Sequence, residues 1–434
     1  MRVGFRYRWV YKFAVLSLCF NLIILYYTYH SPNIKYKKDS ILPIEVTVTT
    51  EENKEVREKE SNFDSEKIPI IILTCNRPFY LEKTLSYILK YHPFKKNILS
   101  SRFPIYLSHA CENSKIQKII KKMKIYISAY LYYIPDIEWI KKRVKFDEFM
   151  LDSEKYIQYC RISDHYRTAL NWIFGNHINK ENSFEIYSAN NHSLEHYKSV
   201  IIFEDDLEIS PDTFEYFSAL YRLLRKDNSL YCISAWNDHG QENRINKSAP
   251  EQLYRTDFFS GLGWMMLRSL WLELEPGWSE CFWDEYMRKI ISRKNRHCIR
   301  PEISRTRTFG KLGVSNSQFY DTHLKYQYIN RLFVNFSKID LSYLEVRNFN
   351  KYWLGKIFIN TTEKNLKYLS LFKMKDKSIR LKYSSFKEYS AIAEIFNLLS
   401  DVKSGIPRSS YQGVVTIIYD FTRIYIYPAL LKPY

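Results

Sequence analysis

Short apolar runs alternate with amphipathic stretches along most of the chain. Runs of strand length occupy residues 68–74, 104–108, 125–134, 200–203 and 230–235. Hydrophobic residues recur at helical spacing within residues 81–89, 116–123, 153–174 and 212–224. Ser210 and Pro211 are expected to be the N-cap and the first residue of the last of these helices. Short all-apolar strands that alternate with such helices are typical of a mostly parallel sheet covered on both faces, so the pattern predicts an α/β fold.

The pattern also divides the chain into regions. Residues 68–326 carry the alternating elements and are predicted to form the main domain. After Gln327 the chain becomes strand-like and basic, which predicts a smaller C-terminal domain over residues 327–434. Residues 177–198 are rich in Asn and Ser and have the composition of a surface insertion.

The N-terminal region has the pattern of a membrane anchor. Residues 13–29 carry no formal charge and follow a basic segment, residues 1–12. They can span about 26 Å as a helix, the short end of the membrane-spanning range. A cleaved signal peptide is the alternative, but Tyr26, Tyr27 and Tyr29 stand where small residues would be expected. Residues 30–67 then form a flexible stem, and positive residues before the span place the bulk of the chain in the lumen.

If that topology holds, the chain has four acceptor sites for N-glycosylation, at Asn191, Asn246, Asn335 and Asn360. Of the seven cysteines, only Cys19 falls in the predicted span, and the other six permit three disulfides in an oxidising lumen. No pair has CxxC spacing, so the sequence does not indicate a structural zinc site.

Charge narrows the function classes only slightly. The chain has 65 Lys and Arg against 47 Asp and Glu, a formal charge of +18. That surplus allows nucleic acid, an anionic membrane or a phosphorylated substrate as a partner. No dinucleotide fingerprint, P-loop, HExxH or GxSxG motif is present, and no nucleic-acid-binding motif accompanies the charge.

Polar residues at the carboxyl ends of the predicted strands are the first candidates for a site, because ligands bind there in such sheets. They are Asn76 and Arg77, residues 108–111, and Glu204 to Asp206. Three crowded carboxylates raise one another's pKa unless a cation intervenes, which favours Mn²⁺ or Mg²⁺. The alternative is an acidic cluster that complements the dipole of the following helix.

Other residues have two interpretations each. Asp284 directly follows Trp283. It is either a catalytic base beside an aromatic ring on which a sugar stacks, or an ion-pair partner of Arg288 one helical turn further on. His165 is a ligand-binding residue or a buried core histidine. Arg77 meets a phosphate or pairs with a carboxylate.

Several collinear stretches resemble the family of α-1,3-mannosyl-glycoprotein 2-β-N-acetylglucosaminyltransferases, that is, N-acetylglucosaminyltransferase I. They are HYRTALNWIF from His165, IIFEDDLEISPDTFEYF from Ile201, LYRTDFFSGLGW from Leu253, FWDEYMR from Phe282 and CIRPEISRTRTFGKLGVS from Cys298. The resemblance implies a type II Golgi membrane protein with a single span, a lumenal catalytic domain and a GT-A fold. It also implies inverting transfer of GlcNAc from UDP-GlcNAc to O2 of the α-1,3-linked mannose of high-mannose N-glycans, which initiates hybrid and complex glycans.

The resemblance assigns roles by position. Asp206 corresponds to the Mn²⁺ ligand, Glu204 and Asp205 lie near the donor, and Asp284 corresponds to the catalytic base. Arg77, His165 and Ser315 match positions that contact the nucleotide-sugar, and residues 311–323 match a loop that orders over it. Cys75 with Cys111, and Cys232 with Cys298, fall on the two disulfides of the family.

The chain departs from the family in a few places. Ala110 and Asn76 each replace an Asp, and the loss of a charged hydrogen bond to the uracil at Ala110 would cost about 1.5–3 kcal/mol of donor affinity. His109 is the neighbouring candidate for a replacement contact. Cys160 and Cys281 have no counterpart and are hypothesised to form a third bridge near the site.

Two other functions stay open from the sequence. The first is a related transferase that adds GlcNAc in β-1,2 linkage to protein O-mannose, with the same metal, donor and base. The second is a glycan-binding pseudoenzyme, which the Ala110 substitution motivates.

Overall fold

The computed structural model describes residues 65–93, 101–143, 154–175, 184–188, 197–314, 319–365 and 377–432. Residues Lys59–Tyr434 form one compact unit. The predicted tail at 1–12, the span at 13–29 and the stem up to residue 64 lie outside the described residues. Within the described ranges, no helix is long and apolar enough to cross a membrane.

A nine-stranded sheet forms the centre of this unit, in the order β4-β3-β2-β1-β5-β9-β7-β10-β8. The strands are β1 (Ile70–Thr74), β2 (Ile105–His109), β3 (Ala129–Tyr133), β4 (Phe184–Ser188), β5 (Ser199–Glu204), β7 (Leu230–Ser234), β8 (Leu253–Thr256), β9 (Trp264–Leu267) and β10 (His297–Pro301). Strands β1, β2, β3 and β5 are mutually parallel, and β7 pairs in parallel with β10. Strand β9 is antiparallel to both β5 and β7, so these two point the same way. The predicted α/β fold with a largely parallel sheet is confirmed.

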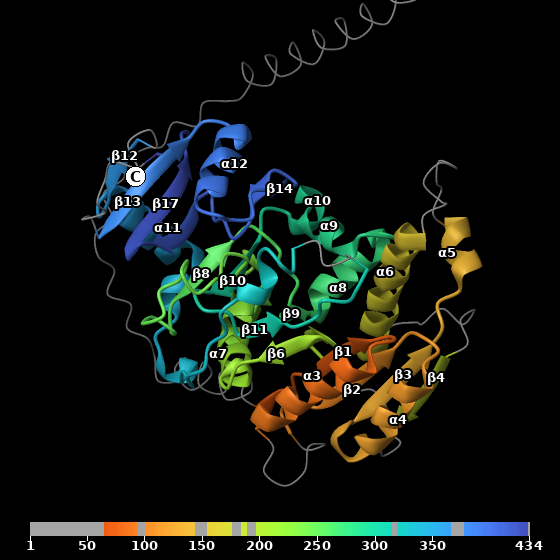
Figure 1. Cartoon of the computed structure of the whole chain (residues 1–434). Coiled ribbons are helices and arrows are strands. Elements are labelled where there is room, and N and C mark those ends of the chain that lie inside the picture. The colour runs from red at the N-terminus through yellow and green to blue at the C-terminus, as the bar shows by residue number, and fades with distance from the viewer. Residues whose placement is uncertain are drawn as a thin grey trace, which may run out of the picture. The chain divides into compact units, whose positions relative to one another are not determined.

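Helices cover both faces of the sheet, so all residues of β1, β2 and β7 are buried. In β1, Ile70 and Ile72 belong to one hydrophobic cluster, whereas Ile71 and Leu73 belong to another. The first face packs against α3 (Pro78–Tyr91), α4 (Ser114–Lys122) and α7 (Thr213–Lys226), and the second against α6 (Glu154–Ile173), α8 (Arg268–Leu274) and α9 (Trp283–Arg288) (Figure 1).

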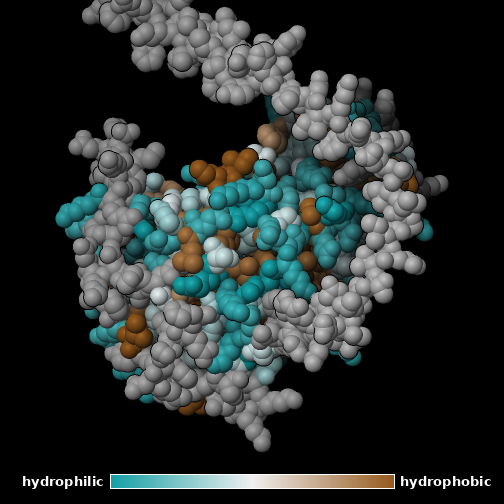
Figure 2. Space-filling view, turned by 180° about the vertical axis from the view of Figure 1, so that it is seen from behind, coloured by the Kyte–Doolittle hydropathy of each residue, from teal (hydrophilic) through white to brown (hydrophobic). Residues whose placement is uncertain are grey.

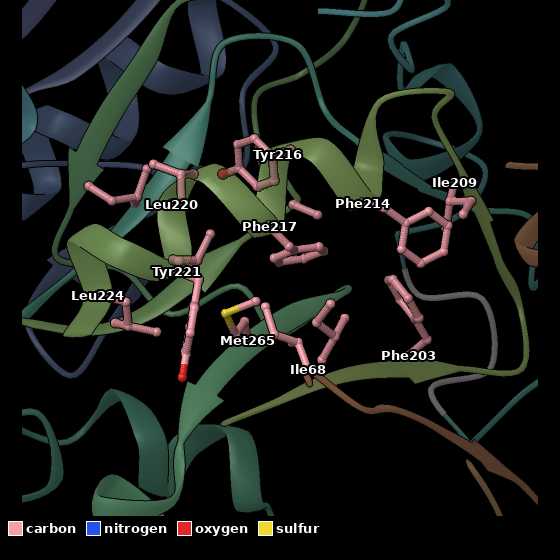
Figure 3. Close-up of a cluster of buried hydrophobic side chains, with 14 of the residues drawn as sticks. Ile68, Phe203, Ile209, Phe214, Tyr216, Phe217, Leu220, Tyr221, Leu224 and Met265 are labelled. Atoms are coloured by element: carbon pink, nitrogen blue, oxygen red, sulfur yellow. The ribbon is translucent and has the colours of Figure 1, made fainter. Parts of the chain in front are cut away.

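Helix α7 illustrates how the sequence pattern becomes packing. Its apolar residues Phe214, Phe217, Leu220, Tyr221 and Leu224 recur three or four positions apart. They point from one side of the helix towards β5 and β9 (Figure 3). Burying each such side chain stabilises the fold by about 1.5–3 kcal/mol. Because the buried residues recur at helical spacing, the spacing alone predicts the helix.

The predicted start of α7 is wrong by two residues. The helix begins at Thr213, and Asp212 rather than Ser210 is its N-cap. The Asp212 carboxylate accepts hydrogen bonds from the Ser210 hydroxyl (2.6 Å) and the Arg305 guanidinium (3.0 Å), and the Arg305–Asp212 pair is fully buried. A buried guanidinium requires a carboxylate partner, so residues 210–212 form a turn that serves Arg305 instead of a first helical turn.

Two other sequence predictions are corrected at the edge of the sheet. Of the predicted strand 125–134, only Ala129–Tyr133 form β3, because Lys124–Tyr126 form the 3₁₀ helix η2 next to α4. Residues 177–198 are not simply an insertion, since Phe184–Ser188 form the edge strand β4, antiparallel to β3.

The C-terminal region has a four-stranded sheet of its own, β12-β13-β17-β16. Its elements are α11 (Val346–Phe358), β12 (Thr362–Lys364), β13 (Ser378–Tyr383), α12 (Phe386–Ile395), β16 (Val415–Tyr419) and β17 (Thr422–Pro428). Strands β13, β16 and β17 and helix α12 share a hydrophobic cluster that includes Ile379, Leu381 and Ile392. Trp353 and Tyr425 belong instead to the main core cluster, so this sheet is packed onto the larger one. The domain boundary at residue 327 stays a prediction.

The remaining elements are short. They are α5 (Ile137–Arg143), β6 (Leu207–Ile209), η3 (Glu275–Gly277), α10 (Ile290–Arg293), β11 (Thr306–Thr308), η4 (Leu324–Tyr326), η5 (Phe336–Lys338), η6 (Ser342–Leu344), β14 (Val402–Lys403) and β15 (Ile406–Pro407). The face drawn in Figure 2 is mostly hydrophilic, and its hydrophobic residues form only small patches. Such a surface suits a chain that keeps its apolar residues inside.

Six cysteines form three disulfides. Cys75 pairs with Cys111, Cys232 with Cys298, and Cys160 with Cys281. The first joins the segments that follow β1 and β2, and the second joins the neighbouring strands β7 and β10. The hypothesised third bridge is therefore present.

Candidate active site

The candidate site lies where β1 and β5 end side by side. Thr74, the last residue of β1, donates a hydrogen bond to the Asp205 carboxylate (2.7 Å). Arg77, three residues further on, donates to Asp206 (2.7 Å) and pairs with Asp205. Because β1 and β5 are adjacent and parallel, their carboxyl ends meet, as the sequence predicted. Of its two interpretations, Arg77 shows the carboxylate pairing.

Burial and mutual repulsion shape the electrostatics of this cluster. Burial, with repulsion from Asp206 next, raises the pKa of Glu204 to about 7. Burial also raises the pKa of Asp205 to about 6, although Arg77 acts in the opposite direction. The pKa of Arg77 itself is raised despite burial, because the Asp206 and Asp205 carboxylates favour its charged form. The single guanidinium of Arg77 therefore does not fully offset the negative charge of this carboxylate cluster.

The geometry around Asp206 fits a divalent cation. Its Oδ1 atom is buried and has no hydrogen-bond partner among the described residues. Gly310 lies against the same carboxylate, since a Cβ atom there would be 2.1 Å from Asp206 Oδ2. In the described part of the chain no three His, Cys, Asp or Glu side chains gather to hold a metal. These residues could supply one carboxylate ligand to the cation. Oxygens of a bound ligand and water would complete its coordination.

Tyr166 connects this carboxylate cluster to Asp284. Its hydroxyl donates to Glu204 (2.7 Å), and its ring stacks on Trp283 with 3.9 Å between centroids. Burial raises the pKa of Tyr166 well above its usual value, and the charges of Glu204, Asp284 and Asp206 raise it further. Burial and the charges of these carboxylates therefore keep the Tyr166 hydroxyl protonated.

Asp284 stands at the start of α9, next to α6 (Figure 1). Its carboxylate accepts a hydrogen bond from Arg288 (2.7 Å), as the second sequence interpretation predicted. The Asp284 side chain is nevertheless 38% exposed, whereas Arg288 is almost fully buried. Asp284 thus combines a fixed orientation with access from solvent, which a general base requires.

The backbone before Asp284 is held from several sides. Phe282 has a left-handed conformation (φ 52°) and packs against the rings of Tyr156 and Tyr159 of α6. The neighbouring Cys281 is bonded to Cys160, also of α6. A non-glycine residue persists in that conformation only where its surroundings enforce it, so α6 determines where α9 begins.

His165 is a buried residue of α6 that lies next to the end of β2, and its imidazole is neutral. Its Nε2 atom is 2.9 Å from the Ser108 hydroxyl. Burial, followed by the charge of His109, lowers the pKa of His165 to about 3. His109 is buried as well, with Nε2 3.1 Å from the Cys75 carbonyl, and burial lowers its pKa to about 4. Both histidines can contact a ligand through neutral nitrogens only, and a role of His109 in place of the missing Asp stays a prediction.

Part of the predicted donor loop lies outside the described residues. Ser315 is among residues 315–318, of which nothing is described. On its N-terminal side the Leu312 carbonyl accepts a hydrogen bond from Arg77 (3.1 Å), and Lys311 pairs with Asp321 on the other side of residues 315–318 (3.0 Å).

Sequence reasoning missed two site residues, Thr74 and Tyr166. Thr74 is the one polar residue of an otherwise apolar strand, which was a usable signal. Tyr166 gave none, because its contacts to Glu204 and Trp283 span 38 residues of sequence or more.

We expect loss of the Cys160–Cys281 bridge to lower both stability and activity. Replacing both residues by Ala opens a loop of 121 residues and should cost about 2–5 kcal/mol of unfolding free energy. It also frees the segment before Asp284, so kcat should fall several-fold at temperatures where the protein is folded. Thermal unfolding and initial rates measure the two effects.

The bridge between Cys232 and Cys298, with 66 residues between its ends, is the control. Its loss should lower stability and leave kcat unchanged below the unfolding temperature. Equal kcat losses in the two double variants would contradict a positioning role for the Cys160–Cys281 bridge.

The chain is similar in sequence to a known protein family and to a curated relative. The model of the GNT-I family matches residues 28–432. The α-1,3-mannosyl-glycoprotein 2-β-N-acetylglucosaminyltransferase of Arabidopsis thaliana is 31% identical over 358 residues, which are 82% of this chain and 72% of that protein.

Two solved structures are similar at low identity. Mouse xyloside xylosyltransferase 1 is 11% identical, with a TM-score of 0.27, and the match covers 53% of this chain and 77% of that chain. The glycosyltransferase GlyE of Streptococcus pneumoniae is also 11% identical with a TM-score of 0.27, and the match covers 84% and 81%. These scores are too low to bear on the fold or the function.

Proposed function

This chain belongs to the GNT-I family, and from that premise we propose that it transfers N-acetylglucosamine to a mannosyl glycoprotein. The donor is UDP-GlcNAc, and the acceptor is O2 of the α-1,3-linked mannose of a high-mannose N-glycan. The product begins hybrid and complex N-glycans. In this proposal the main sheet is a GT-A domain, and the chain is a single-pass type II protein of the Golgi membrane with its catalytic part in the lumen.

The bridge through Tyr166 is the structural observation that carries the proposal. Direct transfer needs charge stabilisation at the leaving group and a base at the acceptor hydroxyl, close together. Tyr166 donates to Glu204 on one side, and its ring stacks on Trp283 on the other, directly before Asp284. The candidate groups for stabilising the leaving group and for acting as the base are thus connected through the side chain of Tyr166.

Asp284 acts as the base in one displacement. Its carboxylate accepts the proton of mannose O2 while O2 forms a bond to the anomeric carbon of GlcNAc. The bond from that carbon to the diphosphate oxygen breaks on the opposite face, and UDP leaves with the electron pair. One displacement inverts the anomeric centre, so no second carboxylate is needed as a nucleophile. Arg288 holds Asp284 in place through its hydrogen bond.

The donor side depends on Asp206, which would hold Mn²⁺ through its carboxylate. When bound, the cation supplies a positive charge that offsets the charge on the diphosphate. In this proposal Glu204 and Asp205 lie beside the donor, and Arg77 and the neutral His165 contact the nucleotide. The partnerless Oδ1 atom of Asp206 supports this assignment.

The proposal is tested with the full-length chain, UDP-GlcNAc and Mn²⁺. We expect transfer to a five-mannose N-glycan and none to an O-mannosyl peptide, with the β-1,2 linkage confirmed by NMR of the product. Transfer to the peptide alone would support the O-mannose transferase instead. Binding of UDP-GlcNAc or of the glycan without any transfer would identify a pseudoenzyme.

A further inference from the structure

A large polar groove borders the two-stranded sheet of β6 and β11. It is a cavity of about 1280 Å³ between the loop at residues 241–248, the segment at residues 321–331 and the turn that joins β16 to β17. Asp321 and Thr322, at the end of the predicted donor loop, line it, whereas Arg77, Glu204 to Asp206 and Asp284 do not. We call this cavity the lateral groove.

The lateral groove and the carboxylate cluster share the two-stranded sheet of β6 and β11. Glu208, two residues after Asp206, pairs with Arg307, which lines the groove. On the same ribbon the Phe309 amide donates to the Asp206 carbonyl (3.0 Å). The ribbon of β6 and β11 therefore connects the groove to the segment that carries Asp206.

Most charged side chains that line the groove take part in ion pairs. Lys247 pairs with Glu242 (2.7 Å), Lys325 pairs with Asp321 (3.4 Å), and Arg307 and Arg331 both pair with the buried Glu208. A site for phosphate or nucleic acid would present cations to its ligand instead. The lining offers balanced hydrogen-bond donors and acceptors, including the amides of Asn243, Asn246 and Asn397.

Two exposed aromatic rings complete the groove. Phe421 is 96% exposed and Tyr326 is 56% exposed. Phe421 and Asp420 form the turn between β16 and β17, and both have positive φ (61° and 46°). Such a turn favours Gly, Asn or Asp, so a phenylalanine there is unfavourable for the turn itself. An exposed ring held out at a strained position is consistent with a binding role.

We propose that the lateral groove binds the non-reacting arms of the acceptor glycan. A neutral oligosaccharide presents hydroxyl groups to polar side chains and apolar C–H faces to aromatic rings, which matches this lining. The inference rests on the proposed function, because a branched acceptor must extend beyond the mannose that reacts. A glycan attached to Asn246 itself is the competing occupant, since this predicted acceptor site also lines the groove.

The test compares a large and a small acceptor. Phe421→Asn removes the ring and leaves a residue that tolerates positive φ, and Tyr326→Ser removes the second ring. In the double variant we expect the KM for the five-mannose N-glycan to rise about tenfold. The KM for UDP-GlcNAc and for a trisaccharide that ends in the reacting mannose should stay unchanged. Phe386→Asn, at a half-exposed phenylalanine of α12 outside the groove, is the control.

Direct binding separates this inference from the proposed function. Calorimetry of the full-length chain with the five-mannose glycan should show about tenfold weaker binding in the double variant, whether or not the wild type transfers GlcNAc. If both acceptors change equally, or if glycan binding is unaffected, the groove is not an acceptor subsite. Peptide mapping that finds Asn246 glycosylated, together with an unchanged KM, would assign the groove to the protein's own glycan.

Discussion

Asp284→Asn is expected to reduce transfer of GlcNAc by roughly 10²–10⁴-fold, the contribution of a general base. The substitution keeps the shape of the side chain and an oxygen that accepts from Arg288, so the fold and the binding of UDP-GlcNAc should persist. It removes the proton acceptor, so kcat should fall while the KM for the donor changes little. Initial rates with the five-mannose N-glycan, thermal unfolding and calorimetry with the donor measure these quantities.

Glu285→Gln is the matched control for this variant. Glu285 is the next residue of α9, also accepts from Arg288 (3.1 Å), and pairs with Lys403 (2.9 Å). Its loss removes one negative charge from the same helix at a comparable exposure. We expect its kcat to stay within a few-fold of the wild type. Activity of Asp284→Asn within tenfold of the wild type would show that the base lies elsewhere.

Asp206→Asn should abolish stimulation by Mn²⁺ and lower transfer by at least roughly 10²-fold. The amide retains one oxygen for Arg77 and removes the charge that would hold the cation. The binding of Mn²⁺ in the presence of UDP should weaken in parallel. Electron paramagnetic resonance of Mn²⁺ follows this binding and does not depend on turnover.

The control for Asp206 is Glu82→Gln, which removes an exposed carboxylate of α3 that pairs with Lys122 (3.4 Å). This variant should bind Mn²⁺ and UDP as the wild type does. Unchanged Mn²⁺ affinity in Asp206→Asn would refute its role as the metal ligand. The buried Oδ1 atom of Asp206, which has no hydrogen-bond partner among the described residues, would then need another explanation.

The central strands and helices could be predicted because their signals are local. Ile70 to Thr74 are all buried, and their run of apolar residues shows that directly. The recurrence of Phe214, Phe217 and Leu224 along α7 likewise needs no knowledge of the partners. The position of Glu204 to Asp206 after such a strand was enough to place them at the edge where β1 and β5 end.

Predictions failed where a distant residue decided the local structure. The start of α7 shifted because Arg305, 93 residues away, binds Asp212. Residues 184–188 became a strand because β3 offered an unpaired edge.

Local residue patterns were enough to predict the α/β elements, and the family resemblance supplied the proposed roles of Asp206 and Asp284. Tertiary structure decided that Tyr166 joins these two carboxylates through Glu204 and Trp283. It also decided that the paired charges of the lateral groove leave it nearly neutral. The physical reason is that periodic burial repeats every few residues, whereas hydrogen bonds, ring stacking and ion pairs depend on which distant segments folding brings into contact.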